Sequence, residues 1–290
     1  MKIKENRLIG FAIIALIYVI ACIFGIWVYR LTPGSVYIKV LTADMAATIT
    51  VYLFSLLLKN STVYDPYWSV APIVILPLLA MEYANTGLGT IFMLTAVTTW
   101  GVRLTYNWVK TFKNLNIQDW RYDMLKERSK GLFPLVNFFG IQVFPTVIVY
   151  LCMLPAIALI QNDSFNILTL AGFVVCFFAV LLQGISDYEM HEFRKNNSDR
   201  CALMRQGLWK YCRHPNYFGE ILMWWGIFIM MMSSVPDMFY LLAGPLANTL
   251  MFVFISIPMA EKRLAGYKTD FDEYIKQTRV LIPLPKPLFK

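Results

Sequence analysis

Long apolar stretches separated by short polar segments dominate this 290-residue chain. A helix needs about 20 mostly apolar residues to cross a bilayer, and we identify eight stretches that approach or exceed this length. The third is short and contains Pro72 and Pro77, so it is either an ordinary span or a broken or re-entrant one, and seven spans is the alternative count. The pattern predicts an all-α fold, a polytopic membrane helix bundle. The eight stretches are Leu8–Tyr29, Val40–Leu58, Trp68–Met81, Leu88–Val109, Pro134–Ile160, Ile167–Ile185, Tyr217–Met232 and Met238–Met259.

The distribution of basic residues predicts the orientation of these spans. If the loops alternate from a cytoplasmic N-terminus, 23 of the 26 Lys and Arg residues fall on the cytoplasmic side, and only Arg30 and Lys39 fall in outer loops. Arg103 is the remaining one, inside the fourth stretch. This asymmetry is the positive-inside pattern, so we expect both termini in the cytoplasm. The net charge of +8 then reflects membrane orientation and anionic lipid partners, not nucleic acid.

Composition and cysteine usage narrow the protein class further. Hydrophobic residues make up 58% of the chain and charged residues 15%, whereas soluble domains carry roughly 25% charged residues. The first stretch is longer than a signal-peptide core and no small-x-small cleavage pattern follows it, so we expect an uncleaved span. The five cysteines lack metal-site spacing, so neither a metal site nor a disulfide framework is expected. We expect a multi-pass protein of a bacterial inner membrane or an endoplasmic-reticulum-type membrane.

The chain divides by character into two predicted parts. Residues 1–109 are nearly loop-free transmembrane hairpins, whereas residues 110–290 contain three long cytoplasmic segments and most of the charge. Polar connections of this length are usually functional. No Gly-rich phosphate loop follows a strand pattern, which excludes a Rossmann or P-loop nucleotide domain. Any cofactor is therefore expected among the cytoplasmic helix ends of residues 110–290.

The segment Gly207–Glu220 places a polar cluster at the start of a predicted transmembrane helix. Arg213 and His214 directly precede Pro215, a residue favoured at the first helical position. Helix starts expose unpaired N–H groups and the positive end of the backbone dipole. This segment is therefore suited to hold an anion.

Two further sets of polar residues lie on helical faces near that cluster. Asn216 and Glu220 are four residues apart, and a carboxylate one turn inside a membrane span usually has a function or a partner. Gln183, Asp187 and Arg194 share one stripe of the sixth stretch and its continuation. The stripe is either a ribose- or amide-binding ladder that ends in a phosphate-binding Arg, or an ordinary amphipathic exit helix.

Other features have both structural and functional interpretations. Gly219 and Gly226 permit either close helix packing or the approach of a flat ring. The C-terminal segment, with aromatic residues at helical spacing and Arg279, is either a closure over a diphosphate or a membrane-surface anchor. Arg103 is either part of a structural ion pair or a substrate-site residue. Its candidate ion-pair partners are Asp44, Asp65 and Glu82.

Four motifs in this order resemble the steroid 5-alpha-reductase family, in particular its large, uncharacterised, prokaryote-rich branch. They are an Asp-Pro-Tyr-Trp-Ser element at Asp65–Ser69, a Trp-x-x-Arg-Leu element at Trp100–Leu104, an Asp-Trp-Arg-Tyr element at Asp119–Tyr122, and the signature at Gly207–Glu220. The resemblance implies a membrane reductase in which NADPH lies among cytoplasmic helix ends and passes a hydride to the beta carbon of an enone in a lipid-like substrate.

The resemblance also implies roles for individual residues. The Ser-Asp-Tyr element with an Arg seven residues later is similar to Ser186–Tyr188 with Arg194, and the Arg before Leu-Ile-Pro is similar to Arg279. No catalytic residue is assigned, and Trp100, which cannot act as an acid, stands nearest the position of the family's ketone-polarising Tyr. The expected cofactor-binding residues are Gln183, Asp187, Arg194, Arg213, His214, Asn216, Tyr217, Glu220 and Arg279. The expected substrate-binding residues are Asp65, Trp68 and Arg103.

Two alternative functions remain at this stage. Isoprenylcysteine carboxyl methyltransferases share an Arg-His-Pro-x-Tyr-x-Gly element and hold S-adenosylmethionine at similar helix ends. Asp187 with Arg194, and Glu220 directly after Gly219, favour the reductase. The second alternative is a non-catalytic membrane protein that binds lipid.

Overall fold

The computed structural model describes residues 2–286. Met1 and residues 287–290, which belong to the two predicted cytoplasmic ends, lie outside the described residues. Within residues 2–286 all regular structure is helical, apart from one isolated β-bridge between Cys212 and Arg279. This confirms the predicted all-α class. All five cysteines are free thiols.

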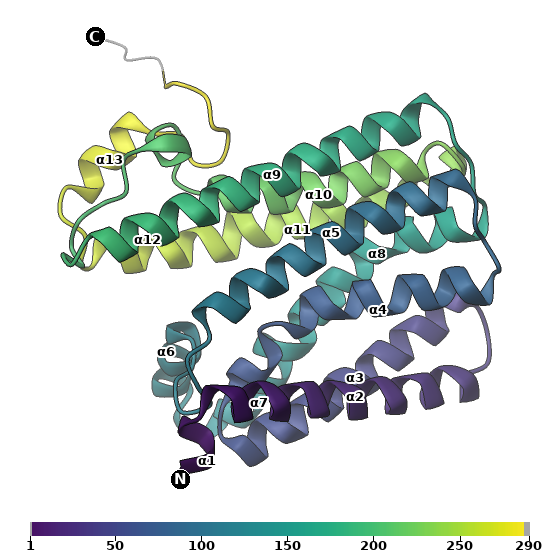
Figure 1. The fold of residues 1–290 in the computed structure, drawn as a ribbon, viewed down its shortest axis with the longest axis horizontal. Coiled ribbons are helices and arrows are strands. Elements are labelled where there is room, and N and C mark those ends of the chain that lie inside the picture. Colours follow the sequence, from purple (N-terminus) through teal and green to yellow (C-terminus); the bar gives the residue numbers. More distant parts are fainter. Residues whose placement is uncertain (1, 287–290) are drawn as a thin grey trace. The chain divides into compact units, whose positions relative to one another are not determined.

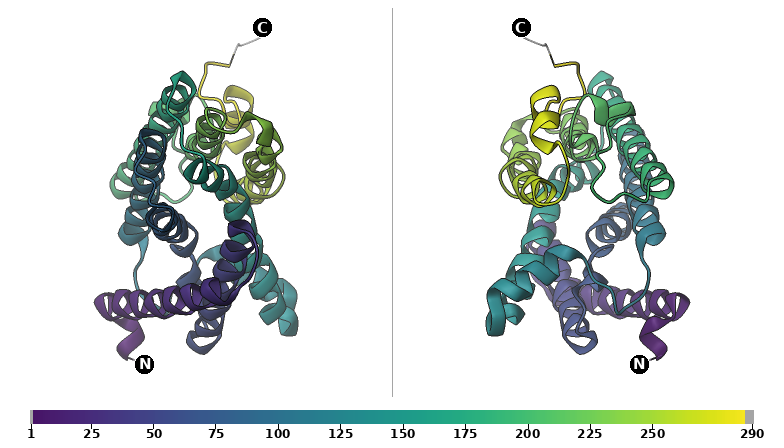
Figure 2. Two further views of the ribbon diagram at one scale, coloured as in Figure 1. Left: turned by 90° about the vertical axis from the view of Figure 1, so that its right-hand side faces the viewer. Right: turned by 90° about the vertical axis from the view of Figure 1, so that its left-hand side faces the viewer.

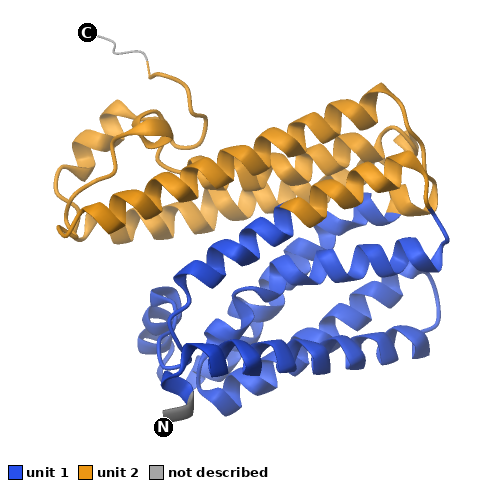
Figure 3. Cartoon of the chain, in the orientation of Figure 1, with its two compact units in different colours: residues 1–85, 100–157 blue, residues 86–99, 158–290 orange. Residues whose placement is uncertain are grey.

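The chain forms two compact units (Figure 3). Unit 1 comprises residues 1–85 and 100–157, and unit 2 comprises residues 86–99 and 158–290. The predicted division at residue 109 follows the character of the sequence, whereas these units follow the packing of the chain. The predicted division stays a prediction.

Unit 1 is built on the antiparallel pair of α2 and α3, which pack along each other (Figure 1). The Asn6 side chain caps α2 by accepting hydrogen bonds from the backbone N–H groups of Leu8 and Ile9. The helices of this unit are α1 (Lys2–Glu5), α2 (Arg7–Leu31), α3 (Val36–Leu58), α4 (Tyr67–Glu82), the C-terminal half of α5 (Leu88–Thr111), α6 (Trp120–Ser129), α7 (Phe133–Val136) and most of α8 (Phe144–Gln161).

A buried polar network interrupts the apolar stretch predicted at Pro134–Ile160. Residues Asn137–Val143 form a π-helix between α7 and α8. The Asn137 and Gln142 amides both donate to the Ser55 hydroxyl of α3, at 3.0 and 2.9 Å. Ser61 in turn donates to the Asn137 carbonyl oxygen at 3.0 Å. These contacts satisfy buried groups of Ser55, Ser61 and Asn137 that would otherwise be costly in an apolar interior, whereas Gln142 Oε1 has no hydrogen-bond partner among the described residues.

Unit 2 is built on α9 (Ile167–Asn196) and α10 (Pro215–Met231), which lie side by side in Figures 1 and 2. α10 begins at Pro215, the position that the sequence predicts. The remaining helices of this unit are the N-terminal half of α5, the last residues of α8, α11 (Ala243–Met251), α12 (Ile257–Ala265) and α13 (Phe271–Gln277).

Glycines set the distance between α9 and α10. A Cβ atom added to Gly226 would lie 2.8 Å from the Gly172 carbonyl oxygen and 2.5 Å from the Cys176 sulfur. A Cβ added to Gly219 would lie 2.7 Å from the Ala179 carbonyl oxygen. Neither gap leaves room for a side chain, so the structure supports the packing interpretation of these glycines.

Six helical stretches of the described residues are long and apolar enough to cross a membrane, and some of them join several consecutive helices. They are Arg7–Leu31 (α2), Val36–Leu58 (α3), Ser61–Glu82 (ending in α4), Trp120–Gln161 (α6 to α8), Ile167–Asn196 (α9) and Pro236–Ala265 (which contains α11 and α12). The predicted stretches Leu88–Val109 and Tyr217–Met232 form α5 and α10 but are not among the six, because α10 has only 17 residues and α5 carries several polar residues. The count of eight spans is therefore not confirmed.

The third predicted stretch is not a broken helix, whereas its crossing or re-entry of the membrane stays a prediction. α4 runs without interruption through Pro72 and Pro77. Two lost backbone hydrogen bonds are tolerated in a helix whose neighbours pack around it.

We predict that Gly226→Ala destabilises the protein by about 1–3 kcal/mol, because the new methyl group overlaps the backbone of α9. Thermal unfolding of the detergent-purified protein measures this loss. Gly131→Ala is the matched control, since no atom lies within 4 Å of its added Cβ. Equal melting temperatures for both variants would contradict the close α9–α10 contact.

Candidate functional site

In unit 2, two predicted cofactor residues meet across the α9–α10 interface. The Gln183 side-chain amide of α9 donates to Glu220 Oε2 of α10 at 2.8 Å, and the Trp224 indole N–H donates to Glu220 Oε1 at 3.2 Å. Gln183 is 1% exposed and Glu220 is 6% exposed. The Gln183 Oε1 atom is buried and has no hydrogen-bond partner among the described residues. This arrangement leaves one buried acceptor unsatisfied beside a fixed carboxylate.

Arg213 and His214, the residues at the start of α10, share one carboxylate. Arg213 Nε lies 2.6 Å from Glu261 Oε1, and His214 Nε2 lies 3.1 Å from the same oxygen. Arg213 also donates to the Thr278 carbonyl oxygen at 2.9 Å and is 6% exposed. The Arg213 guanidinium is therefore committed to α12 and to the segment after α13, which fixes the C-terminal segment in place.

The C-terminal segment pairs with the backbone just before α10. The Arg213 N–H donates to the Arg279 carbonyl at 3.0 Å, and the Arg279 N–H donates to the Tyr211 carbonyl at 3.0 Å. The Tyr274 hydroxyl of α13 donates to the Trp209 carbonyl at 2.5 Å. These bonds hold the half-buried Arg279 beside the start of α10.

Two further predicted residues lie at this helix start. The His214 and Tyr217 rings stack with centroids 5.2 Å apart and planes 9° apart. The half-buried Asn216 accepts the Tyr217 N–H through its side-chain oxygen at 3.1 Å.

The predicted stripe of Gln183, Asp187 and Arg194 lies on the single continuous helix α9. Gln183 is buried, Asp187 is half-buried and Arg194 is exposed, so the stripe runs from the interior to the surface. Lys268 is close to its outer end: burial lowers the pKa of Lys268, and the positive charge of Arg194 lowers it further. Neighbouring cations of this kind favour the binding of an anion, which relieves their repulsion.

The predicted substrate residues all lie in unit 1. The Asp65 carboxylate accepts a hydrogen bond from the Tyr122 hydroxyl of α6. The Trp68 ring of α4 lies 6.1 Å from the Trp100 ring of α5. Arg103 follows on α5, one turn after Trp100. The structure thus places the expected substrate residues in one unit and the expected cofactor residues in the other.

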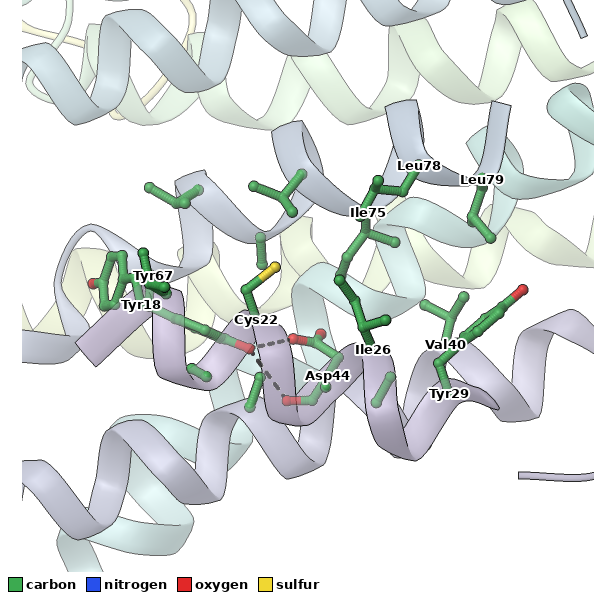
Figure 4. A pocket seen from close by; sticks show the side chains of 18 of the residues that line it. Tyr18, Cys22, Ile26, Tyr29, Val40, Asp44, Tyr67, Ile75, Leu78 and Leu79 are labelled. Carbon is green, nitrogen blue, oxygen red and sulfur yellow. Dashed lines mark hydrogen bonds between the residues drawn. The ribbon is translucent and has the colours of Figure 1, made fainter. Parts of the chain in front are cut away.

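Unit 1 also contains a cavity of about 730 Å³ between α2, α3 and α4 (Figure 4). Its wall is mostly aliphatic, and volumes of this size suit a drug-sized molecule. The Tyr67 hydroxyl donates to Asp44 Oδ1 at 2.7 Å and to the Asp44 carbonyl at 3.2 Å, as the dashed lines in Figure 4 show. Asp44 is 2% exposed and Tyr67 is 6% exposed.

Sequence reasoning missed this pair and the partner of Arg213. Asp44 was considered only as a partner for Arg103, whereas the structure gives it to Tyr67. The signal for Tyr67 was present, since it lies inside the polar and aromatic element Tyr64–Ser69. Glu261 lies 48 residues after Arg213, and nothing local in the sequence connects the two.

Comparisons with known proteins find partial matches. An uncharacterized protein, C594.04c, of Schizosaccharomyces pombe is 24% identical over 201 residues, which cover 59% of this chain and 57% of that protein. The 3-oxo-5-alpha-steroid 4-dehydrogenase 1 of Macaca fascicularis is 30% identical over 114 residues, and that of Homo sapiens is 29% identical over 114 residues. Each of these two matches covers 39% of this chain and 40% of the relative.

The matched part of the chain therefore spans less than two thirds of the length of these relatives. No solved structure matches the chain at a significant level. A family model matches residues 51–278, which include all twelve expected site residues except Arg279. The chain belongs to the family described as a protein of unknown function, DUF1295, which is part of the steroid 5-alpha-reductase-like group.

Proposed function

We propose that this protein is an integral-membrane oxidoreductase that uses NADPH to reduce the C=C bond of an enone in a lipid- or steroid-like substrate. Similarity to the 3-oxo-5-alpha-steroid 4-dehydrogenases supports a reductase. The observation that carries the proposal is the buried, unsatisfied Gln183 oxygen beside Glu220 in unit 2.

The Gln183–Glu220 pair fits the carboxamide of a nicotinamide ring. Because a carboxylate only accepts hydrogen bonds, Glu220 fixes the Gln183 amide with its N–H₂ toward Glu220 and its oxygen away from it. The free oxygen then accepts a hydrogen bond from a carboxamide N–H₂. A buried acceptor without a partner costs about 1–3 kcal/mol, and a bound carboxamide would remove that cost.

The phosphate-binding role belongs to Arg194 and Arg279, with Lys268 beside Arg194, in this proposal. Arg194 is exposed and adjacent to Lys268, and Arg279 is held at the start of α10 by its backbone hydrogen bonds. Arg213 takes a different role, because its guanidinium is already bound to Glu261 and Thr278. It positions Arg279 and does not bind phosphate.

The Asp44–Tyr67 pair supplies the substrate-polarising group in this proposal. NADPH, when bound, supplies the hydride for the beta carbon of the enone. The Tyr67 hydroxyl has one proton, which it donates to Asp44 in the structure, so the enone oxygen would replace Asp44 as its acceptor when the substrate binds. A hydrogen bond to the oxygen stabilises the negative charge that develops there, and the aliphatic cavity wall excludes water. Asp65, Trp68 and Arg103 complete the substrate side of unit 1.

We predict that NADPH raises the melting temperature of the detergent-purified protein and that S-adenosylmethionine does not, because only a ligand of the native state stabilises it. Arg194→Gln and Arg279→Gln should each remove most of the NADPH-dependent shift while leaving the melting temperature without ligand nearly unchanged. Arg213→Gln should instead lower the melting temperature without ligand, because it leaves the Glu261 carboxylate without its guanidinium partner.

Arg128→Gln is the control for the loss of one exposed positive charge. A shift with S-adenosylmethionine alone would replace the reductase with a methyltransferase. The absence of a shift with either compound would favour the non-catalytic lipid-binding protein.

We predict that Tyr67→Phe lowers the turnover of NADPH oxidation by about 10²–10⁴-fold with any enone that the wild type reduces, the usual effect of a lost general acid. NADPH oxidation is followed by absorbance. Tyr52→Phe is the matched control on α3, since its hydroxyl donates only to the Pro134 carbonyl. Turnover of Tyr67→Phe at the level of Tyr52→Phe would exclude this role for Tyr67.

A further inference from the structure

The polar groups of the unit 1 cavity lie at its Tyr29 end and near its middle. Figure 4 shows Tyr18 at one end, Tyr29, Leu78 and Leu79 at the other, and the hydrogen bonds between the Tyr67 hydroxyl and Asp44 between Cys22 and Ile26. The cavity follows α2 from Tyr18 to Tyr29, eleven residues along the helix, which at about 1.5 Å per residue gives a length of about 16 Å. An elongated apolar ligand with one polar group at the Tyr29 end and a second near the middle of the cavity matches this distribution.

The Tyr29 end of the cavity carries an excess of positive charge. Arg30 and Glu82 line it, and Glu82 lies close to the Tyr29 hydroxyl. The Lys39 ammonium lies 5.5 Å from the centre of the Tyr29 ring. Two cations, one of them in the cavity wall, therefore accompany one carboxylate.

The predicted topology also distinguishes these two cations from the other basic residues. Arg30 and Lys39 are the only basic residues that the predicted topology places in outer loops. Arg30 lines the cavity beside Tyr29, and Lys39 lies over the ring of the same Tyr29. A role in binding explains why basic residues occur there against the general asymmetry.

We propose that the cavity takes an apolar carboxylic acid, with the carboxylate at Arg30 and the other end of the molecule at the Asp44–Tyr67 pair near the middle of the cavity. The substrate class is then an oxo-acid: an enone at one end of an apolar body and a carboxylate at the other. A guanidinium at the cavity mouth binds a carboxylate by charge-assisted hydrogen bonds. The substrate assignment rests on the proposed function, whereas acid binding in the cavity does not require it.

Photolabelling tests the binding and its direction in the detergent-purified protein without cofactor. The probe is an octanoic acid analogue with a diazirine near its methyl end, and its methyl ester is the uncharged control. The acid should label peptides that contain Asp44 or Tyr67 more strongly than the ester does. Arg30→Gln should lower labelling by the acid about tenfold, the effect of one lost charge-assisted contact. Glu82→Gln should raise it, because a like charge is removed.

The control variant is Arg128→Gln, an exposed basic residue far along the chain from the cavity helices, which should label as the wild type does. Equal labelling by acid and ester, unchanged in Arg30→Gln and Glu82→Gln, would overturn the proposal. The cavity would then be a binding site for a lipid chain without selectivity for a carboxylate. Labelling at the Arg30 or Glu82 peptides in place of the Asp44 and Tyr67 peptides would overturn the proposed direction. Because no NADPH is present, failure here is distinguishable from failure of the proposed reductase, which the NADPH-dependent thermal shift tests.

Discussion

The close approach of α9 and α10 determines the geometry of the proposed cofactor site. Gly226 and Gly219 bring the backbone of α10 against Gly172 and Ala179 of α9. This proximity allows the short side chain of Gln183 to reach Glu220 directly across the interface. Without it, Glu220 would be a buried carboxylate with fewer donors, which is costly in an apolar interior. The glycines therefore determine the Gln183–Glu220 contact indirectly, because they set the spacing between α9 and α10.

The same constraint extends to the polar segment between α9 and α10. The Trp209 indole donates to the Ser186 carbonyl of α9 at 3.1 Å, and the Leu208 N–H donates to Glu189 at 3.0 Å. Gly207 adopts a φ of +55°, and a Cβ there would overlap the Glu189 carboxylate. The segment thus folds back on α9 before α10 begins, and the C-terminal segment pairs with it. The Arg213–Glu261 ion pair completes this assembly.

Arg213 belongs to a motif that is typical of anion binding, but its partner in the structure is a carboxylate of the same chain. The sequence places an Arg and a His at a helix start, which is a suitable environment for an anion. The anion that the structure supplies is Glu261, so the helix start binds a carboxylate of the same chain. In the proposed function the phosphate-binding charges come instead from Arg194 and Arg279, which lie on separate segments; Lys268, near Arg194, already donates to the Arg200 and Ala202 carbonyls.

Much of the fold could be predicted from the sequence because hydrophobic length and proline position are local signals. α2, α3 and α9 lie where apolar stretches predict them, and α10 begins at Pro215. The sequence does not decide between an uninterrupted and a broken α4, because the effect of a helix proline depends on its neighbours. The π-helix before α8 and the Asp44–Tyr67 bond were not predictable either, since both depend on packing between residues far apart in sequence.

A cryo-electron microscopy structure of the protein with bound NADP⁺ tests the central claim most directly, because it locates the nicotinamide itself. Density for the carboxamide is expected within hydrogen-bonding distance of the Gln183 side-chain oxygen, with Gln183 and Trp224 still donating to Glu220. Density for the nicotinamide elsewhere, with the Gln183 oxygen still buried and without a ligand contact, would contradict the claim.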